Sequence, residues 1–145
     1  MSIAIAREIA RKAHEKQSYT GSPGDYFEAH VCQVVLQLYD EGINDEETIM
    51  AAYLHDVLED NPSYSAYTFQ REGIPPSVIE IVKLLTKLKN ECPLQYLLRL
   101  SKDPKALDVK LADAKVNARG GRGKYKITVP LLEALKDGTL LHKQI

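Results

Sequence analysis

The spacing of apolar residues is the feature that most constrains the fold of this chain. Between positions 27 and 41 the apolar side chains recur every three or four residues: Val31, Val34, Val35 and Leu38. This spacing places them on one face of an α-helix, which Gly42 is expected to close. Alternation of apolar and polar residues with a period of two, which is typical of strands, is nearly absent. The sequence therefore predicts an all-α fold.

Loop-forming residues separate this segment from the predicted helices on either side. An amphipathic first helix is expected over residues 2–17, and a loop rich in glycine, proline and hydroxyl residues follows at 18–25. Asn44 or Asp45 is expected to cap a third helix, which runs towards Asp60 before an Asn-Pro break.

Proline and glycine divide the second half of the chain in the same way. Helices are expected over residues 65–71, from 75–77 through Leu85, after Pro93, after Pro104 and over 130–136. Residues 118–124 are basic and rich in glycine, which favours a flexible loop over a continued helix. With 145 residues, of which 44% are hydrophobic, the chain can bury its own core as one domain over residues 1–145. The expected architecture is a compact multi-helix bundle.

Composition excludes several classes of protein. The formal charge of -1 removes the general electrostatic argument for a nucleic-acid partner. The chain has no apolar run of the roughly 20 residues that a membrane span needs, and its N-terminus lacks the apolar core of a signal peptide. Cys32 and Cys92 lack the spacing of a thiolate metal site or a disulfide framework. We therefore expect a cytoplasmic protein with reduced thiols, no membrane contact and no nucleic-acid partner.

The segment from His55 to Asp60 carries the strongest chemical signal. On a continuous helix, His55 and Glu59 would lie within about 40° of each other around the axis, as would Asp56 and Asp60. Three acids at the C-terminal end of a helix oppose the helix dipole and repel one another. A bound cation would remove this conflict. The alternative is a solvated acidic helix end before a turn.

Other candidate ligands lie farther away in the sequence. Asp113 stands among apolar residues, where it could either bind a divalent ion or pair with Lys110 or Asn117. His14 and His30 flank the loop at residues 18–25. A single histidine on a helix is more often a surface or core residue than a ligand, so spacing alone does not assign either one.

Taken in order, these segments resemble the H…HD…D pattern of HD phosphohydrolases. The residues that match this pattern are His30, then Leu54-His55-Asp56-Val57-Leu58-Glu59-Asp60, then Lys110-Leu111-Ala112-Asp113 with Asn117. More narrowly, the chain resembles the hydrolase domain of RelA/SpoT proteins and the small alarmone hydrolases. The resemblance runs from about residue 5 to residue 119, and it includes the histidine before the loop, His14.

The resemblance implies a metal centre and a reaction. One manganese ion would be coordinated by His30, His55, Asp56 and Asp113, while the Glu59-Asp60 pair would orient and activate the attacking water. Imidazole combined with carboxylate suits manganese, iron or zinc better than magnesium. The implied reaction is removal of pyrophosphate from the 3′ position of guanosine tetraphosphate or pentaphosphate. The implied partner is therefore a small phosphorylated nucleotide.

Candidate substrate contacts follow partly from the resemblance and partly from charge. Asn117 matches the substrate-contacting asparagine of the family. An anionic substrate needs cationic neighbours, and the candidates are Lys87, Lys89, Arg119, Arg122 and Lys124. Lys89 and Arg119 are the preferred contacts. For each of them, a solvated surface charge is an equally good explanation.

One departure from the family pattern concerns substrate choice. Related enzymes carry a basic pair in the loop after the first helix, where this chain has Tyr19-Thr20. The ring of Tyr19 could stack on a nucleobase, but it brings no charge. Two alternatives therefore stay open: hydrolysis of another nucleotide or phosphorylated dinucleotide, and a non-catalytic helical module that senses a nucleotide. The intact Glu59-Asp60 pair argues against the second.

Overall fold

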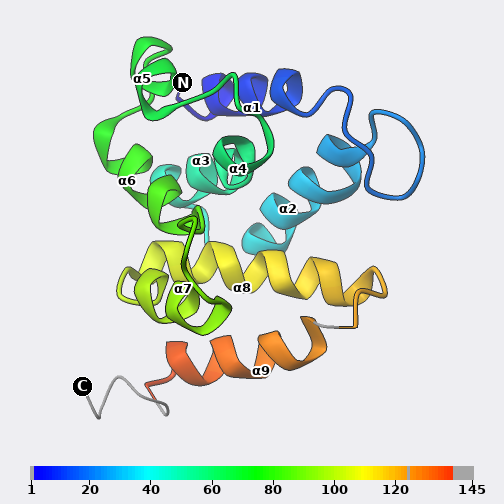
Figure 1. The fold of residues 1–145 in the computed structure, drawn as a ribbon, viewed down its shortest axis with the longest axis vertical. Coiled ribbons are helices and arrows are strands. Elements are labelled where there is room, and N and C mark those ends of the chain that lie inside the picture. Colours follow the sequence, from blue (N-terminus) through cyan, green and yellow to red (C-terminus); the bar gives the residue numbers. More distant parts are fainter. Residues whose placement is uncertain (1, 124, 139–145) are drawn as a thin grey trace.

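The computed structural model describes residues 2–123 and 125–138, and every regular element within these ranges is helical (Figure 1). This confirms the all-α prediction. The elements are α1 (Ser2–Ala13), η1 (Phe27–Val31), α2 (Cys32–Asp40), α3 (Glu46–Leu54), α4 (Val57–Asp60), α5 (Ala66–Arg71), α6 (Pro76–Leu85), α7 (Pro93–Leu100), α8 (Pro104–Arg119) and α9 (Tyr125–Lys136). None of these helices is long and apolar enough to cross a membrane.

The core is built around α3 and α8. Helix α8 crosses the middle of the molecule, with α9 along one side of it and α2 and α3 on the other (Figure 1). Helix α3 also packs against α1 and α6. It is buried on nearly every side, through Ile49, Met50, Ala51, Ala52 and Leu54. A helix that is apolar all round belongs in a core, and its end is therefore held firmly.

Capping residues and prolines begin the helices where the sequence predicts. The Asp45 side chain accepts a hydrogen bond from the backbone N–H of Thr48 and caps α3. Pro76 and Pro104 occupy the first positions of α6 and α8, where the missing N–H costs nothing. These starts fix the register of the helices around the core.

Two differences from the predicted helices lie beside the loop at residues 18–25. The first helix ends at Ala13 instead of near residue 17, because the chain turns there and Gln17 N–H bonds back to His14 O. The predicted helix over residues 27–41 begins with the π-helical turn η1, in which Cys32 N–H donates to Phe27 O. Such turns change the direction of side chains locally and often occur at functional sites.

Two further differences lie near the C-terminal end. Helix α8 continues through Arg119, so the expectation of a loop from residue 118 is wrong for its first two positions. Helix α9 begins at Tyr125, not at residue 130, and it includes Pro130. Leu132 and Leu135 are buried, and packing of this apolar face offsets the backbone hydrogen bond that a proline cannot make.

Candidate metal centre and active site

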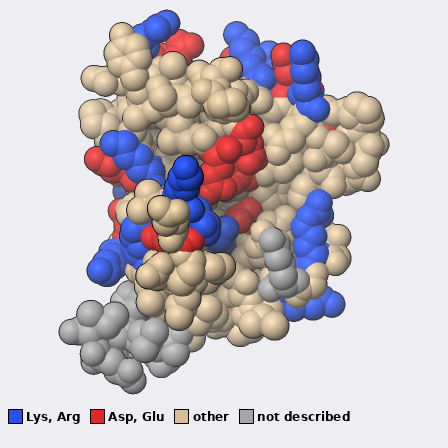
Figure 2. Space-filling model, in the orientation of Figure 1, with Lys and Arg blue, Asp and Glu red and all other residues tan. Residues whose placement is uncertain are grey.

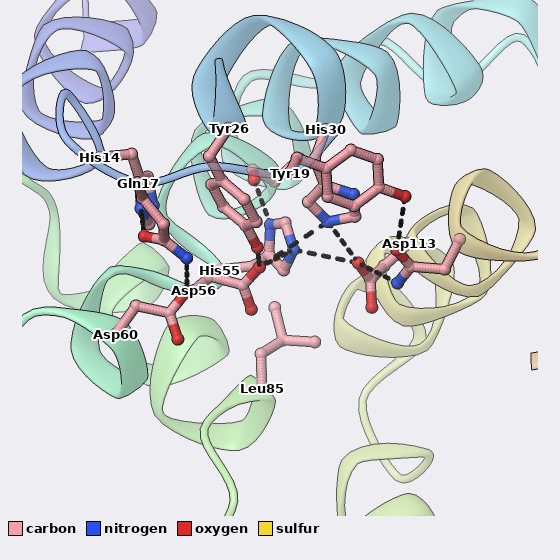
Figure 3. Close-up of polar contacts among 12 residues, drawn as sticks. His14, Gln17, Tyr19, Tyr26, His30, His55, Asp56, Asp60, Leu85 and Asp113 are labelled. Atoms are coloured by element: carbon pink, nitrogen blue, oxygen red, sulfur yellow. Dashed lines mark hydrogen bonds and ion pairs between the residues drawn. The ribbon is translucent and has the colours of Figure 1, made fainter. Parts of the chain in front are cut away.

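Four side chains from three parts of the fold converge on one point (Figure 3). His30 comes from η1, His55 and Asp56 lie between α3 and α4, and Asp113 comes from α8. Asp113 Oδ1 lies 2.8 Å from His30 Nε2 and 3.3 Å from His55 Nε2. Asp56 Oδ2 lies 3.0 Å from His55 Nε2 and 3.7 Å from His30 Nε2. One donor atom from each residue lies within 4.8 Å of all the others.

A break in the helix gives His55 and Asp56 their positions. The prediction of a continuous helix towards Asp60 is wrong, because α3 ends at Leu54 and α4 begins at Val57. Nδ1–H of His55 donates to the Ala52 carbonyl at 2.6 Å, which turns Nε2 towards the carboxylates. The break thus allows both neighbours to contribute a donor atom to the same point.

The donor set has the character of a cation site. Because His55 donates through Nδ1, its Nε2 is left to bind either a proton or a metal ion, and this atom lies towards two carboxylates. Burial opposes ionisation of Asp56, but neighbouring His55 prevails and lowers the pKa of that carboxyl to about 2. Burial likewise disfavours a charged His55, yet Asp56 and Asp113 raise its pKa well above the usual value. The cluster therefore requires positive charge, which a proton or a divalent ion can supply. Two imidazoles and two carboxylates fit such an ion.

Neighbouring side chains hold the two carboxylates in place. Lys110 Nζ lies 3.2 Å from Asp113 Oδ2, and Asn117 Nδ2 donates to Asp113 Oδ1 at 3.3 Å. The Tyr26 hydroxyl donates to Asp56 Oδ2. Partners of this kind orient metal ligands and tune their basicity. The sequence predicted the partners of Asp113. The hydrogen bond from Tyr26 to Asp56 became evident only in the folded structure.

The cluster opens into a cavity of about 280 Å³. It is lined by Ser18, Tyr19, Tyr26, His30, Asp56, Glu59, Asp60, Lys110, Asp113, Asn117, Arg122 and Tyr125. Acidic side chains gather in a hollow at the centre of the face shown in Figure 2. The structure thus brings the Glu59-Asp60 pair and the candidate contacts Tyr19 and Asn117 to the same cavity as His30, Asp56 and Asp113, while the fourth candidate ligand, His55, is buried beside them.

Glu59 and Asp60 both line the cavity, and each is held by a different partner. Glu59 Oε1 accepts a hydrogen bond from the backbone N–H of Lys87 at 2.7 Å, and Asp60 Oδ2 accepts one from Gln17 Nε2 at 2.9 Å. Burial raises the pKa of both carboxyls, and the negative charge of Asp56 adds to this effect. The hydrogen bonds oppose it. Both groups are therefore better proton acceptors than a fully solvated carboxylate.

Tyr19 and Arg122 form a stacked pair at the cavity. The Tyr19 ring lies over His30 with the ring centroids 4.9 Å apart, and its hydroxyl donates to Asn117 Oδ1 at 2.8 Å. The Arg122 guanidinium carbon lies 3.8 Å from the centroid of the Tyr19 ring, and Nη2 donates to the Tyr19 carbonyl at 3.0 Å. A Cβ at Gly120 would lie 3.1 Å from the Tyr19 hydroxyl, so a glycine suits this close approach.

The preferred cationic contacts lie outside this cavity. Arg119 donates to Gln37 and lines a separate surface pocket, and Lys89 lines another one beside α7. Lys87 lines a hollow of about 360 Å³ that adjoins the cavity. Lys124 lies outside the described residues. Among the arginine candidates it is Arg122 that reaches the cavity, so the roles of Lys89 and Arg119 in substrate binding stay predictions.

Comparison with known proteins identifies the family. The family model described as "HD domain" matches residues 6–120. The chain is 33% identical over 126 residues to guanosine-3′,5′-bis(diphosphate) 3′-pyrophosphohydrolase of Aquifex aeolicus, a match that covers 81% of this chain. It is 34% identical over 122 residues to the bifunctional (p)ppGpp synthase/hydrolase SpoT of Escherichia coli K12, covering 77% of this chain. In both cases the match spans 17% of the relative's length.

A solved structure is also similar. It is that of a metazoan ortholog of SpoT described as hydrolysing ppGpp, with a TM-score of 0.69 and 28% identity. The match covers 81% of this chain and 68% of that one. Residues 6–120, which the family model matches, include all four candidate ligands and every residue of the cavity lining except Arg122 and Tyr125. The chain therefore belongs to the HD domain family and is related to the hydrolase domains of SpoT-type proteins.

Proposed function

We propose that this chain is a metal-dependent 3′-pyrophosphohydrolase that acts on guanosine tetraphosphate or pentaphosphate. The observation that carries the proposal is a single cavity that is lined both by Asp56 and Asp113 of the candidate metal cluster and by the carboxylates of Glu59 and Asp60. Similarity to ppGpp hydrolases supports the choice of substrate. A cytoplasmic location also belongs to this proposal and agrees with the free thiols of Cys32 and Cys92.

The proposed metal is manganese, held by His30, His55, Asp56 and Asp113, with iron or zinc as alternatives. A bound divalent ion lowers the pKa of a coordinated water and polarises a phosphoryl oxygen. The Nδ1–H bond from His55 to Ala52 O and the hydroxyl of Tyr26 on Asp56 keep the donor atoms in place for such an ion.

The charge of the cavity couples metal binding to substrate binding. Its lining has four carboxylates, from Asp56, Glu59, Asp60 and Asp113, and two cations, from Lys110 and Arg122. Lys110 already pairs with Asp113. A polyphosphate would be repelled by the remaining negative charge unless a divalent cation offset it. Substrate affinity is therefore expected to depend on the metal.

The reaction needs a proton acceptor next to the attacking water, and Glu59 or Asp60 serves as that group. The water oxygen bonds to the phosphorus attached to O3′, while the carboxylate takes a proton from the water. The bond between phosphorus and O3′ then breaks, pyrophosphate leaves, and the proton held by the carboxylate passes to O3′ directly or through solvent. The raised pKa of both carboxyls favours this role at neutral pH.

The remaining residues of the cavity would hold the nucleotide. Arg122 offers a guanidinium to phosphate oxygens, and Asn117 offers an amide beside Asp113. Tyr19 offers a ring face for a nucleobase once Arg122 moves to the phosphate. This arrangement places a cation near the position where related enzymes carry their basic pair.

One observation favours a second substrate class. The adjoining hollow of about 360 Å³ shares Asp56, Glu59 and Lys110 with the cavity, and Tyr96 and Leu97 provide an apolar wall. A larger substrate, such as a phosphorylated dinucleotide, could occupy both spaces. A nucleotide-sensing module without catalysis is a third candidate, and it requires binding without turnover.

Manganese-dependent turnover of guanosine tetraphosphate, followed by chromatography, tests the proposal. The wild type is expected to release GDP and pyrophosphate, while Asp113→Asn is expected to be inactive. Asp108→Asn is the matched control, because Asp108 is on the same helix but pairs with Lys136. Turnover of a dinucleotide instead would favour the second substrate class. Nucleotide binding without turnover in the metal-loaded wild type would indicate a sensor.

A further inference from the structure

A buried histidine that is not part of the metal cluster connects to Asp60 through a single side chain. His14 is 0% exposed and follows the last residue of α1. Its Nδ1 lies 2.7 Å from Gln17 Oε1, and Gln17 Nε2 donates to Asp60 Oδ2 at 2.9 Å (Figure 3). An amide oxygen can only accept, so His14 carries its proton on Nδ1. The three side chains form a continuous chain of hydrogen bonds.

This chain selects one orientation of the Gln17 amide. With Oε1 directed at His14, the NH₂ group faces the Asp60 carboxylate. In the opposite orientation Oε1 would face the carboxylate, two acceptors would meet, and the Nδ1–H of His14 would meet a second donor. Burial lowers the pKa of His14, which favours the neutral ring. The carboxylate of Asp60, which can only accept, and the Nδ1–H tautomer of His14 thus favour the same orientation of the amide between them.

His14 also packs against Tyr26, the residue that holds Asp56 of the candidate metal cluster. Its ring is 4.8 Å from that of Tyr26, measured between centroids, and the Tyr26 hydroxyl donates to Asp56. A different bond joins α1 to the end of α4, from Asn61 Nδ2 to Ala13 O at 3.0 Å. This second bond already links the end of α4 to α1. The hydrogen bonds of His14 and Gln17 are therefore not needed merely to attach the two helices.

We propose that His14 and Gln17 are positioning residues that orient the Asp60 carboxylate to accept the proton of the attacking water. This inference rests on the proposed hydrolase function. Gln17 acts by fixing the position of Asp60 Oδ2, and His14 acts through Gln17. The hydrogen bond from Gln17 lowers the pKa of Asp60, against the effects of burial and of Asp56, and this keeps the carboxylate ionised.

Kinetic measurements on four variants test the proposal. Gln17→Leu and His14→Leu are expected to lower kcat by about tenfold or more with little change in KM, which is the size of effect expected for residues that orient reacting groups. The acid limb of the kcat/KM profile is expected to move to higher pH, because Asp60 loses a donor. In His14→Asn the Nδ2 atom can replace Nδ1 as donor to Gln17, and it should restore most of the activity. Asn61→Ala should lower Tm without moving the acid limb.

A measurement that needs no turnover separates this inference from the proposed function. NMR of the chain loaded with diamagnetic Zn²⁺ is expected to show the Nδ1–H tautomer of His14, and the Asp60 carboxyl is expected to titrate at higher pH in Gln17→Leu than in wild type. An Nε2–H tautomer, or an unchanged titration of Asp60, would overturn the inference even if the enzyme is active. Absence of turnover in the wild type would count against the proposed function alone.

Discussion

Asp113 Oδ1 on α8 lies 2.8 Å from Nε2 of His30 on η1, so the later half of the chain completes a site begun near its N-terminus. The π-helical turn directs His30 into the bundle, and the buried α8 carries Asp113 to meet it. The site therefore depends on tertiary packing as much as on its local motifs. This dependence leads to specific expectations for side chains around the ligands.

Tyr26→Phe is expected to weaken metal binding by about tenfold or more, because Asp56 loses a hydroxyl donor that orients it. The ring contacts with His14 and His30 would remain. Titration of the chain with Mn²⁺ measures the change in Kd. Tyr53→Phe is the control, since the Tyr53 ring packs on Phe27. Equal affinities in the two variants would show that the Tyr26 hydroxyl does not support the metal centre.

Arg122→Gln is expected to raise KM for the nucleotide by about tenfold or more, because a hydrogen bond to a charged group is worth roughly 1.5–3 kcal/mol. The value of kcat should change much less, because the contacts of Arg122 in this structure are with Tyr19 and not with Glu59 or Asp60, the two candidate general bases. Arg119→Gln provides the comparison, as Arg119 lies outside the cavity. If Arg119→Gln raised KM and Arg122→Gln did not, the assignment of the substrate-binding cation would be reversed.

The pH dependence of kcat/KM should reflect the burial of the two carboxyls. Burial, assisted by the charge of Asp56, raises the pKa of Glu59 and Asp60. A general base works only when it is deprotonated, so activity should begin to fall at a higher pH than for a solvated carboxyl as the solution is acidified. Steady-state kinetics at a series of acidic to neutral pH values measure this acid limb of the kcat/KM profile. A limb at or below the usual carboxyl pKa would indicate that neither group acts as the base.

His14 should make the fold less stable in acid. Burial lowers its pKa from the usual 6.5, although Gln17 and nearby acids oppose this. The unfolded chain then binds a proton more readily, so the stabilising contribution is complete above pH 6.5 and is lost as pH falls towards the folded pKa. Urea unfolding at several pH values should show a steeper acid loss for wild type than for His14→Asn. Parallel curves would exclude His14 as the source of this loss.

The sequence was sufficient to predict the helices because apolar spacing, Asp45 and the prolines act locally. It did not predict the break between Leu54 and Val57, since the apolar residues continue across it and only the folded site shows what His55 and Asp56 gain by leaving the helix. The beginning of α9 was missed for a similar reason. Burial of its apolar face depends on tertiary contacts, which outweigh Pro130.

Helical phase explains the contrast between the candidate contacts on α8. Asn117 is four residues after Asp113 and lies within about 40° of it around the axis, whereas Arg119 is six residues after Asp113 and lies about 120° away. With residues 118 and 119 expected in a loop, this phase could not be applied. Arg122 reaches the cavity because the chain turns after Arg119. The spacing of apolar residues does not predict the direction of that turn.

The metal content of purified protein tests the central claim most directly. The protein is incubated with a known excess of Mn²⁺ and then passed through gel filtration in metal-free buffer, after which elemental analysis should find about one ion per chain in wild type. Asp113→Asn should hold less than about a tenth of that amount, because a buried donor is lost, while Asp108→Asn should match wild type. Full occupancy in Asp113→Asn, or an empty wild type, would contradict a metal centre formed by His30, His55, Asp56 and Asp113.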